Sequence, residues 1–164
     1  MRQFTLILTY TSSDEVQELV NKHLVGSGLL ILPNVVISWL PRQDLERRLL
    51  GIKEELINMM ERGFEGEFAY AIIELTDEQF KAVRPMIVRK LESDSRRLIS
   101  WGETLLKRIR SQRVERVKKE FLRFDREYRQ LVSMHDVFDV KHELLNKVME
   151  LARELRIEYE RKGH

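Results

Sequence analysis

The chain has 164 residues, of which 43% are hydrophobic and 34% charged, and its formal net charge is +2. This length suffices for a core of its own, and the absence of cysteine excludes disulfides, thiolate metal sites and cysteine nucleophiles. No apolar run approaches the roughly 20 residues of a membrane span, and the first strand-like segment is too short and too polar for a signal peptide. We therefore expect a cytoplasmic protein with no membrane partner.

The charge is divided unevenly along the chain. Residues 1–76 carry 7 Lys/Arg and 11 Asp/Glu, whereas residues 77–164 carry 22 Lys/Arg and 16 Asp/Glu. The first segment alternates strand-like and amphipathic runs, and the second contains no credible strand. We predict a compact core over 1–76 and a basic helical extension over 77–164 that packs on this core or on a second subunit. A surface this rich in Arg and Glu fits a heat-adapted host, in which ion-pair networks are more effective, and the alternative is a helix-rich protein of any origin.

The first half contains strand-like and helical segments in a definite order. A strand over 4–10 is followed by a helix, for which Ser12 and Glu15 have capping-box spacing. Two short strands over 29–32 and 35–40, a second helix and a strand over 67–75 come next. The apolar stripes that predict the two helices are Val16, Leu19, Val20 and Leu24, then Leu45, Leu49, Ile52, Leu56 and Met60.

The order β-α-β-β-α-β predicts an α+β fold with a ferredoxin-like core. In this plan both helices pack on one face of a four-stranded antiparallel sheet. The alternative is a single bent strand over residues 29–40, which would leave a three-stranded sheet. The turn pair Pro33-Asn34 favours two strands, because proline cannot donate a ladder hydrogen bond.

The second half predicts about four helices. Thr76 and Gln79 have the capping-box spacing, Ser93-Asp94-Ser95 weakens the first helical pattern, and Ser111-Gln112 breaks it. A regular apolar seam then begins, and the last helix keeps the same period, so we predict an antiparallel helical hairpin with its turn over 134–139. The two sets are Val114, Val117, Phe121, Phe124, Tyr128 and Leu131, and then Leu144, Val148, Leu151 and Leu155. The alternative for the seam aromatics is stacking on nucleic-acid bases.

A basic line lies on the face opposite that seam. Its four cations are spaced by three, four and three residues, which spans about 15 Å at 1.5 Å per residue. A line of that length can meet several phosphates of a nucleic acid. The alternative is a solvated helix face, because Glu115, Glu120 and Glu127 lie close enough to pair with these cations. The candidate nucleic-acid-binding residues are Arg108, Arg110, Arg113, Arg116, Lys119, Arg123 and Arg126.

One segment has the composition of a metal site. On an unbroken helix, His135, Asp139 and His142 would share a face and suit zinc or iron. If the segment is the turn of the hairpin, that geometry fails, Asp139 becomes an N-cap and Asp136 a turn former. We therefore predict no metal.

Signals for catalysis and cofactor binding are also absent. Gly26-Ser-Gly28 follows a helix and precedes a strand, the reverse of a dinucleotide fingerprint. Serines and histidines show no nucleophile-elbow or triad spacing. We therefore predict no cofactor and no enzymatic activity.

Three parts of the chain resemble the N-terminal domain of chromate-resistance regulators of the ChrB type. They are the run GLLILPNVVISWLP over 28–41, the segment Leu75-Thr-Asp-Glu-Gln79 with its long helix, and the helix leading into Met134-His-Asp-Val-Phe138. The family's Trp-Arg pair is missing, with Val20 to Lys22 in its region, and its C-terminal domain has no counterpart. The resemblance implies a cytoplasmic regulator or accessory protein with a ferredoxin-like core, and it transfers no catalytic residue.

The same core is shared by the small CRISPR-adaptation ribonucleases and by the C-terminal part of phenylacetate-pathway repressors. Those nucleases are similar in placing a metal-binding aspartate at the end of the first strand, where this chain has Tyr10-Thr-Ser-Ser13. The first acid, Asp14, falls near the helix start, so a metal-dependent nuclease lacks its essential residue. We expect a non-enzymatic homodimer that binds nucleic acid or an acidic partner protein, and the alternative is a protein–protein scaffold.

Overall fold

The structure, a computed structural model, describes residues 3–163. It divides into two compact units, Met1–Pro85 and Met86–His164, which we call the sheet unit and the helical unit. The division falls at Pro85, inside helix α3 (Asp77–Ser111). Proline has no backbone N–H, so one helical hydrogen bond is missing at this position.

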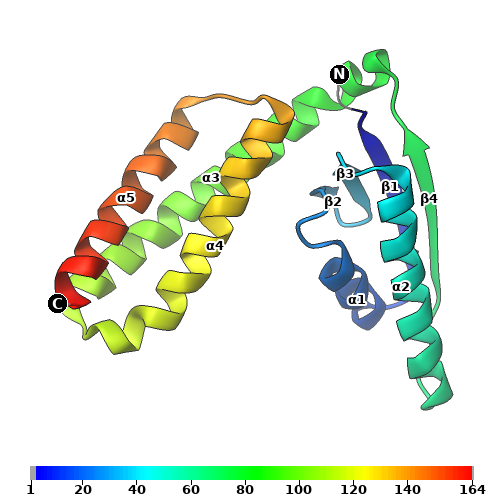
Figure 1. The fold of residues 1–164 in the computed structure, drawn as a ribbon, viewed down its shortest axis with the longest axis horizontal. Coiled ribbons are helices and arrows are strands. Elements are labelled where there is room, and N and C mark those ends of the chain that lie inside the picture. The colour runs from blue at the N-terminus through cyan, green and yellow to red at the C-terminus, as the bar shows by residue number, and fades with distance from the viewer. Residues whose placement is uncertain (1–2, 164) are drawn as a thin grey trace. The chain divides into compact units, whose positions relative to one another are not determined.

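The sheet unit has the predicted βαββαβ order (Figure 1). Its sheet is antiparallel with strand order β2-β3-β1-β4, and α1 and α2 cover the same face. Leu29 pairs with Ile37, so β2 and β3 form a hairpin and the single bent strand is excluded. The elements are β1 (Thr5–Thr11), α1 (Asp14–Leu24), β2 (Leu29–Leu32), β3 (Val35–Ser38), α2 (Arg42–Glu61) and β4 (Phe68–Glu74).

The core of the sheet unit lies between the sheet and its two helices. All four predicted residues of the α1 stripe are buried, as are four of the five in α2, whereas Met60 is 49% exposed. Ile7 and Val36 contribute from the strands, and Phe68, Tyr70 and Ile72 of β4 pack against the same cluster. Alternate residues of β4 therefore face the helices, as the period of two in a strand requires.

The two predicted capping boxes have different outcomes. At Thr76 the box is present, because Thr76 N–H donates to Gln79 Oε1 at 2.9 Å and Gln79 N–H donates to Thr76 Oγ1 at 3.2 Å. At the first helix the prediction is wrong, because the N-cap is Ser13, whose hydroxyl accepts from the N–H of Val16. The Ser12 hydroxyl instead accepts from the N–H of Glu67 at 2.7 Å and joins the two ends of neighbouring strands.

The helical unit contains most of α3 together with α4 (Val114–Phe138) and α5 (Glu143–Gly163). The described part of the chain after Glu74 therefore has three helices, not about four, and no further strand. The predicted break at Ser111-Gln112 is confirmed, but α3 runs through Ser93–Ser95. Polar side chains are satisfied locally there: the Ser95 hydroxyl donates to the carbonyl of Leu91 at 2.7 Å, and Asp94 pairs with Lys90 at 3.0 Å.

The predicted seam is the core of the helical unit. Phe121 and Phe124 are buried, the Phe124 ring meets Trp101 of α3 edge-on, and Phe121 stacks on Tyr159 of α5 with ring centroids 4.1 Å apart. These aromatic rings are therefore core residues and not free platforms for bases. Burial also raises the pKa of Tyr128 above its ordinary value. The antiparallel pairing of α4 with α5 is confirmed (Figure 1).

The hairpin turn lies at 139–142 and not at the predicted 134–139. Helix α4 continues to Phe138, whose side chain is buried with that of His135, and burial of this last turn keeps it helical. Asp139 is the C-cap in the left-handed region with φ 52°, not an N-cap, and its N–H donates to the carbonyl of Asp136 at 3.2 Å. Asp136 belongs to the helix and is not part of the turn. Every described helix is too short or too polar to cross a bilayer.

Candidate functional site

A groove of about 530 Å³ on the helical unit is lined almost entirely by cations of α4. Four of the predicted residues, Arg116, Lys119, Arg123 and Arg126, line it together with Glu120, and we call this set the basic groove. All four cations are exposed. The spacing that predicted one line on the helix therefore produces one continuous concave surface.

The acids that would neutralise such a line are directed elsewhere. Glu127 accepts a hydrogen bond from Arg97 of α3 at 3.1 Å, and Glu120 is paired with Arg108 of α3. Asp125 pairs with Arg129 and with Arg156 of α5, each at 3.0 Å. Three carboxylates of α4 thus hold α4 to its neighbours or to its own next turn, and Glu120, which also lines the basic groove, is engaged by Arg108.

Three of the four cations of the basic groove have no acidic partner among the described residues. Within residues 3–163, Arg116, Lys119 and Arg126 form no salt bridge, and Glu115 pairs with none of the described cations. Of the pairings on which the alternative of a solvated face depends, only that of Glu120 with the upstream Arg108 occurs among the described residues, and Glu127 pairs with Arg97 instead. Four of the five side chains that line the basic groove are exposed cations, and the fifth, Glu120, is paired with Arg108.

Arg123 differs from the other three cations because an aromatic ring supports it. Its guanidinium carbon lies 4.8 Å from the centroid of the Trp101 ring, within cation–π range. The Trp101 indole N–H donates to Glu120 at 3.0 Å. Glu120 thus fixes Trp101 and Arg108 at once, and Trp101 fixes Arg123. The contact of Trp101 with Arg123 was not predictable from the sequence, because no local pattern links a residue to one 22 positions later.

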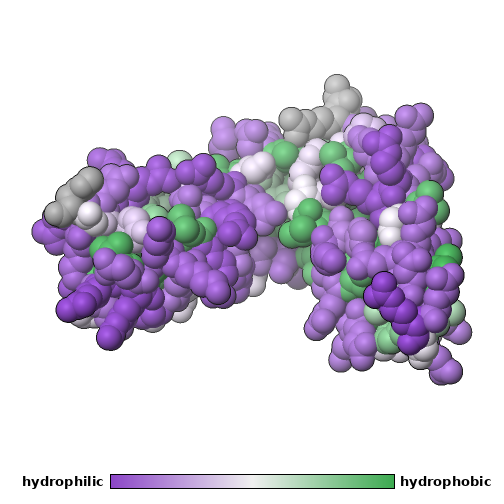
Figure 2. Space-filling view, turned by 60° about the horizontal axis from the view of Figure 1, so that its bottom comes forward, coloured by the Kyte–Doolittle hydropathy of each residue, from purple (hydrophilic) through white to green (hydrophobic). Residues whose placement is uncertain are grey.

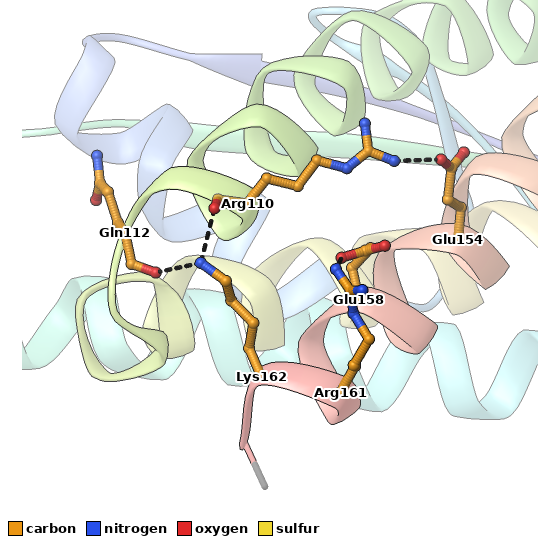
Figure 3. A network of polar contacts seen from close by, with 6 residues as sticks. All are labelled: Arg110, Gln112, Glu154, Glu158, Arg161 and Lys162. Atoms are coloured by element: carbon orange, nitrogen blue, oxygen red, sulfur yellow. Dashed lines mark hydrogen bonds and ion pairs between the residues drawn. The ribbon is translucent and has the colours of Figure 1, made fainter.

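Arg108, Arg110 and Arg113 do not line the basic groove. Arg108 is paired with Glu120, and Arg110 donates to Glu154 of α5 at 2.7 Å. Figure 3 shows that Arg110 belongs to a separate polar network, in which Lys162 also donates to the carbonyls of Arg110 and Gln112. Arg113 is the N-cap of α4 and lines a second hollow with Lys162.

His135 and His142 meet across the α4–α5 turn, although we expected a turn to separate them. Their Nε2 atoms lie 2.8 Å apart, and His135 Nδ1 donates to the carbonyl of Leu131 at 2.8 Å. Burial, and secondarily the neighbouring His142, lowers the pKa of His135 below its ordinary value. His142 Nδ1 is buried without a hydrogen-bond partner. No group of three or more His, Cys, Asp or Glu suited to a metal occurs among the described residues.

The comparisons with known proteins give no family for this chain. No family model, no curated protein and no solved structure matches it.

Proposed function

We propose that this chain is a non-enzymatic nucleic-acid-binding protein that uses the basic groove to bind phosphates. The regulatory or accessory role is the one implied by its resemblance to the ChrB-type regulators. The observation that supports the proposal is the pairing of Glu120, Asp125 and Glu127 with cations outside the groove, which leaves Arg116, Lys119 and Arg126 without a salt bridge among the described residues. The chemistry of the groove is that of an anion-binding surface.

The geometry of the groove suits a polyanion better than a single small anion. The cations extend along about 15 Å of helix, and duplex DNA presents one phosphate charge per roughly 1.7 Å of its axis. Arginine guanidinium groups form bidentate hydrogen bonds with phosphate, and two of the three unpaired cations are arginines. Contacts to phosphates carry no information about the base sequence, so we propose binding without sequence preference.

The proposal includes no catalytic step. Strand β1 ends at Thr11, the following Ser12 hydroxyl is used on Glu67, and Asp14 is the exposed first residue of α1. The described residues therefore offer no carboxylate at the end of β1, which is where the small CRISPR-adaptation ribonucleases require one. A metal-dependent nuclease is therefore the less favoured alternative.

The test is a fluorescence-anisotropy titration of duplex and single-stranded DNA at two salt concentrations. With four phosphate contacts on a duplex, affinity should fall by about a hundredfold between 50 and 200 mM salt, because each contact releases condensed counterions. The double variant Lys119→Glu, Arg126→Glu should weaken binding at low salt and reduce the log–log salt slope by about half.

The control is Lys147→Glu with Arg153→Glu on α5. Both residues are exposed and form no salt bridge within the described chain, so this variant makes the same change in net charge outside the groove. It should leave the slope nearly unchanged. If wild type binds neither DNA form at 50 mM salt, or if both variants lose equal affinity, the proposal is wrong. An acidic partner protein would then be the better candidate for the same cations.

A further inference from the structure

The two edges of the sheet differ in how they are protected. Strand β2 has only four residues, its register is interrupted between Leu30 and Leu32, and Pro33 follows it. Short length, a bulge and proline are devices by which natural proteins prevent an edge strand from pairing with another chain. Strand β4 is the other edge, and it has seven residues without proline, glycine or a charge before Glu74. Only the β4 edge is open to pairing.

The hydrogen bonds of β1 define which groups of β4 point outward. Glu67 accepts from the N–H of Ser12, and Leu75 donates to the carbonyl of Phe4. Because bonded pairs alternate along an antiparallel ladder, Ala69, Ala71 and Ile73 also bond to β1. The N–H and C=O groups of the other residues in β4 then point away from the sheet, and no described backbone group pairs with them. These residues are Phe68, Tyr70, Ile72 and Glu74.

Helix α2 exposes apolar side chains beside this edge. One flank of α2 faces α1, where His23 and Glu55 are hydrogen-bonded. On the opposite flank, Ile57 is 55% exposed and Met60 49% exposed, and both line a groove with Phe68 and Ala69 of β4. Leu50, 53% exposed, is seven residues before Ile57 and continues that flank. Figure 2 shows small hydrophobic patches on the otherwise hydrophilic surface of the sheet unit.

We propose that a second copy of this chain pairs with β4, so that two β4 strands form an antiparallel ladder and two α2 helices pack beside it. A two-fold axis at Ala71, the middle residue of the strand, pairs all seven residues and opposes Tyr70 with Ile72. All eight outward backbone groups then gain partners. The same axis covers the exposed flank of α2 with its own copy. This adds helix contact to a strand ladder, which alone is narrower than a stable interface requires.

Charge favours a copy of this chain over an unrelated strand. The first half of α2, 42–51, has three arginines and two acids, whereas the second half, 52–61, has one lysine and three glutamates. Antiparallel packing of α2 on its copy places each basic half opposite an acidic half. In an antiparallel β4 ladder, Glu74 lies opposite Phe68 of the other copy and not opposite its own equivalent. Both β4 and α2 are therefore complementary in charge to their own copies when the two copies run antiparallel.

The first test is the mass of the protein in solution. Wild type should sediment at twice its 19.7 kDa chain mass across a concentration series. Ala71→Lys should sediment as a monomer, because Ala71 is exposed and its copy would lie directly opposite, where two like charges repel. Ile57→Lys should also give monomer, and the matched control Ile157→Lys, 54% exposed on α5, should remain a dimer. Circular dichroism of each variant verifies that it is folded.

The second test uses the absence of cysteine from the chain. Opposed residues in a non-bonded antiparallel pair have Cα atoms about 4.5 Å apart, which a disulfide can span. Ala71→Cys should therefore be converted to a covalent dimer by the thiol oxidant diamide, and Leu32→Cys on the β2 edge should not. A monomeric wild type, a dimer that Ala71→Lys does not disrupt, or equal cross-linking at both cysteines would overturn the proposal. Each outcome is independent of nucleic-acid binding.

Discussion

The sheet unit and the helical unit are stabilised by different kinds of contact. The core of the sheet unit is mostly aliphatic, and Glu55 of α2 joins α1 through ion pairs with Lys22 and His23. Both units contain aromatic pairs, and the helical unit adds ion pairs that join all three helices. Those ion pairs are Arg97–Glu127, Arg108–Glu120, Arg110–Glu154 and Arg156–Asp125.

This difference explains how one unit can present a basic surface. Strands in a sheet are aligned by backbone hydrogen bonds, so the sheet unit needs few charged side chains to fix its register. Helices bond only within themselves, and side chains must fix how they pack. In the helical unit the carboxylates of α4 contribute to that task, and the cations that remain face solvent. The basic groove is therefore a consequence of how the helices are held together.

The largest expected effect separates the two cores. Phe124→Ala should cost about 3–5 kcal/mol and Ile52→Ala about 2–5 kcal/mol, because both side chains are fully buried. If the units unfold independently, Phe124→Ala should accelerate hydrogen exchange in α4 and α5 peptides and leave β1 and β4 peptides unchanged, and Ile52→Ala should do the reverse. Equal acceleration in both units for either variant would mean that they form one cooperative structure.

A smaller effect distinguishes the units by their response to acid. The pKa of His135 lies below its ordinary value of about 6.5, chiefly through burial, with His142 adding to this and Leu131 and Asp94 opposing it. As the pH falls, the unfolded chain therefore binds a proton at His135 before the folded chain does. The contribution of neutral His135 to the free energy of unfolding is present in full above pH 6.5 and is lost as the pH falls below that value. Asp94 is itself paired with Lys90.

The sheet unit should respond to acid only at lower pH. The hydrogen bond with His23 holds the pKa of Glu55 below its ordinary value of about 4.5, so its contribution is present above that pH and lost below it. Hydrogen exchange of each unit between pH 7 and pH 4 measures the two responses. Destabilisation between pH 6.5 and 5 should be confined to the helical unit and reduced by His135→Gln. If His23→Gln reduces it equally, the assignment to His135 is wrong.

The smallest expected effect concerns the ion pairs themselves. Glu127→Gln removes the partner of Arg97 and should lower stability by no more than about 1 kcal/mol, because the pair is partly exposed and screened by solvent. Glu150→Gln, which removes an exposed acid in the middle of α5 that forms no salt bridge within the described chain, should be close to neutral. Urea denaturation at low and high salt measures both. If the two variants have the same stability at low salt, ion pairs between helices do not stabilise the helical unit as this comparison requires.

Periodic apolar positions made most of the fold predictable from the sequence. The stripes of α1 and α2 and the seam of α4 each follow a helical period, and burial follows them closely because a continuous apolar face must pack. Helix ends were less predictable. Ser12 and Ser13 are equally good caps by type, and only the position of Glu67 beside Ser12 decided between them.

The sequence by itself determined the order of elements, the antiparallel hairpins and the single line of cations on α4, because these depend on local periodicity and turn residues. Tertiary structure decided which carboxylates neutralise which cations, since Glu120 and Glu127 meet partners 12 and 30 positions away. It also decided that Gly102 lies where a Cβ atom would approach Leu151 to 2.6 Å, and that His135 meets His142. Such contacts depend on the packing of whole helices, which no local pattern encodes.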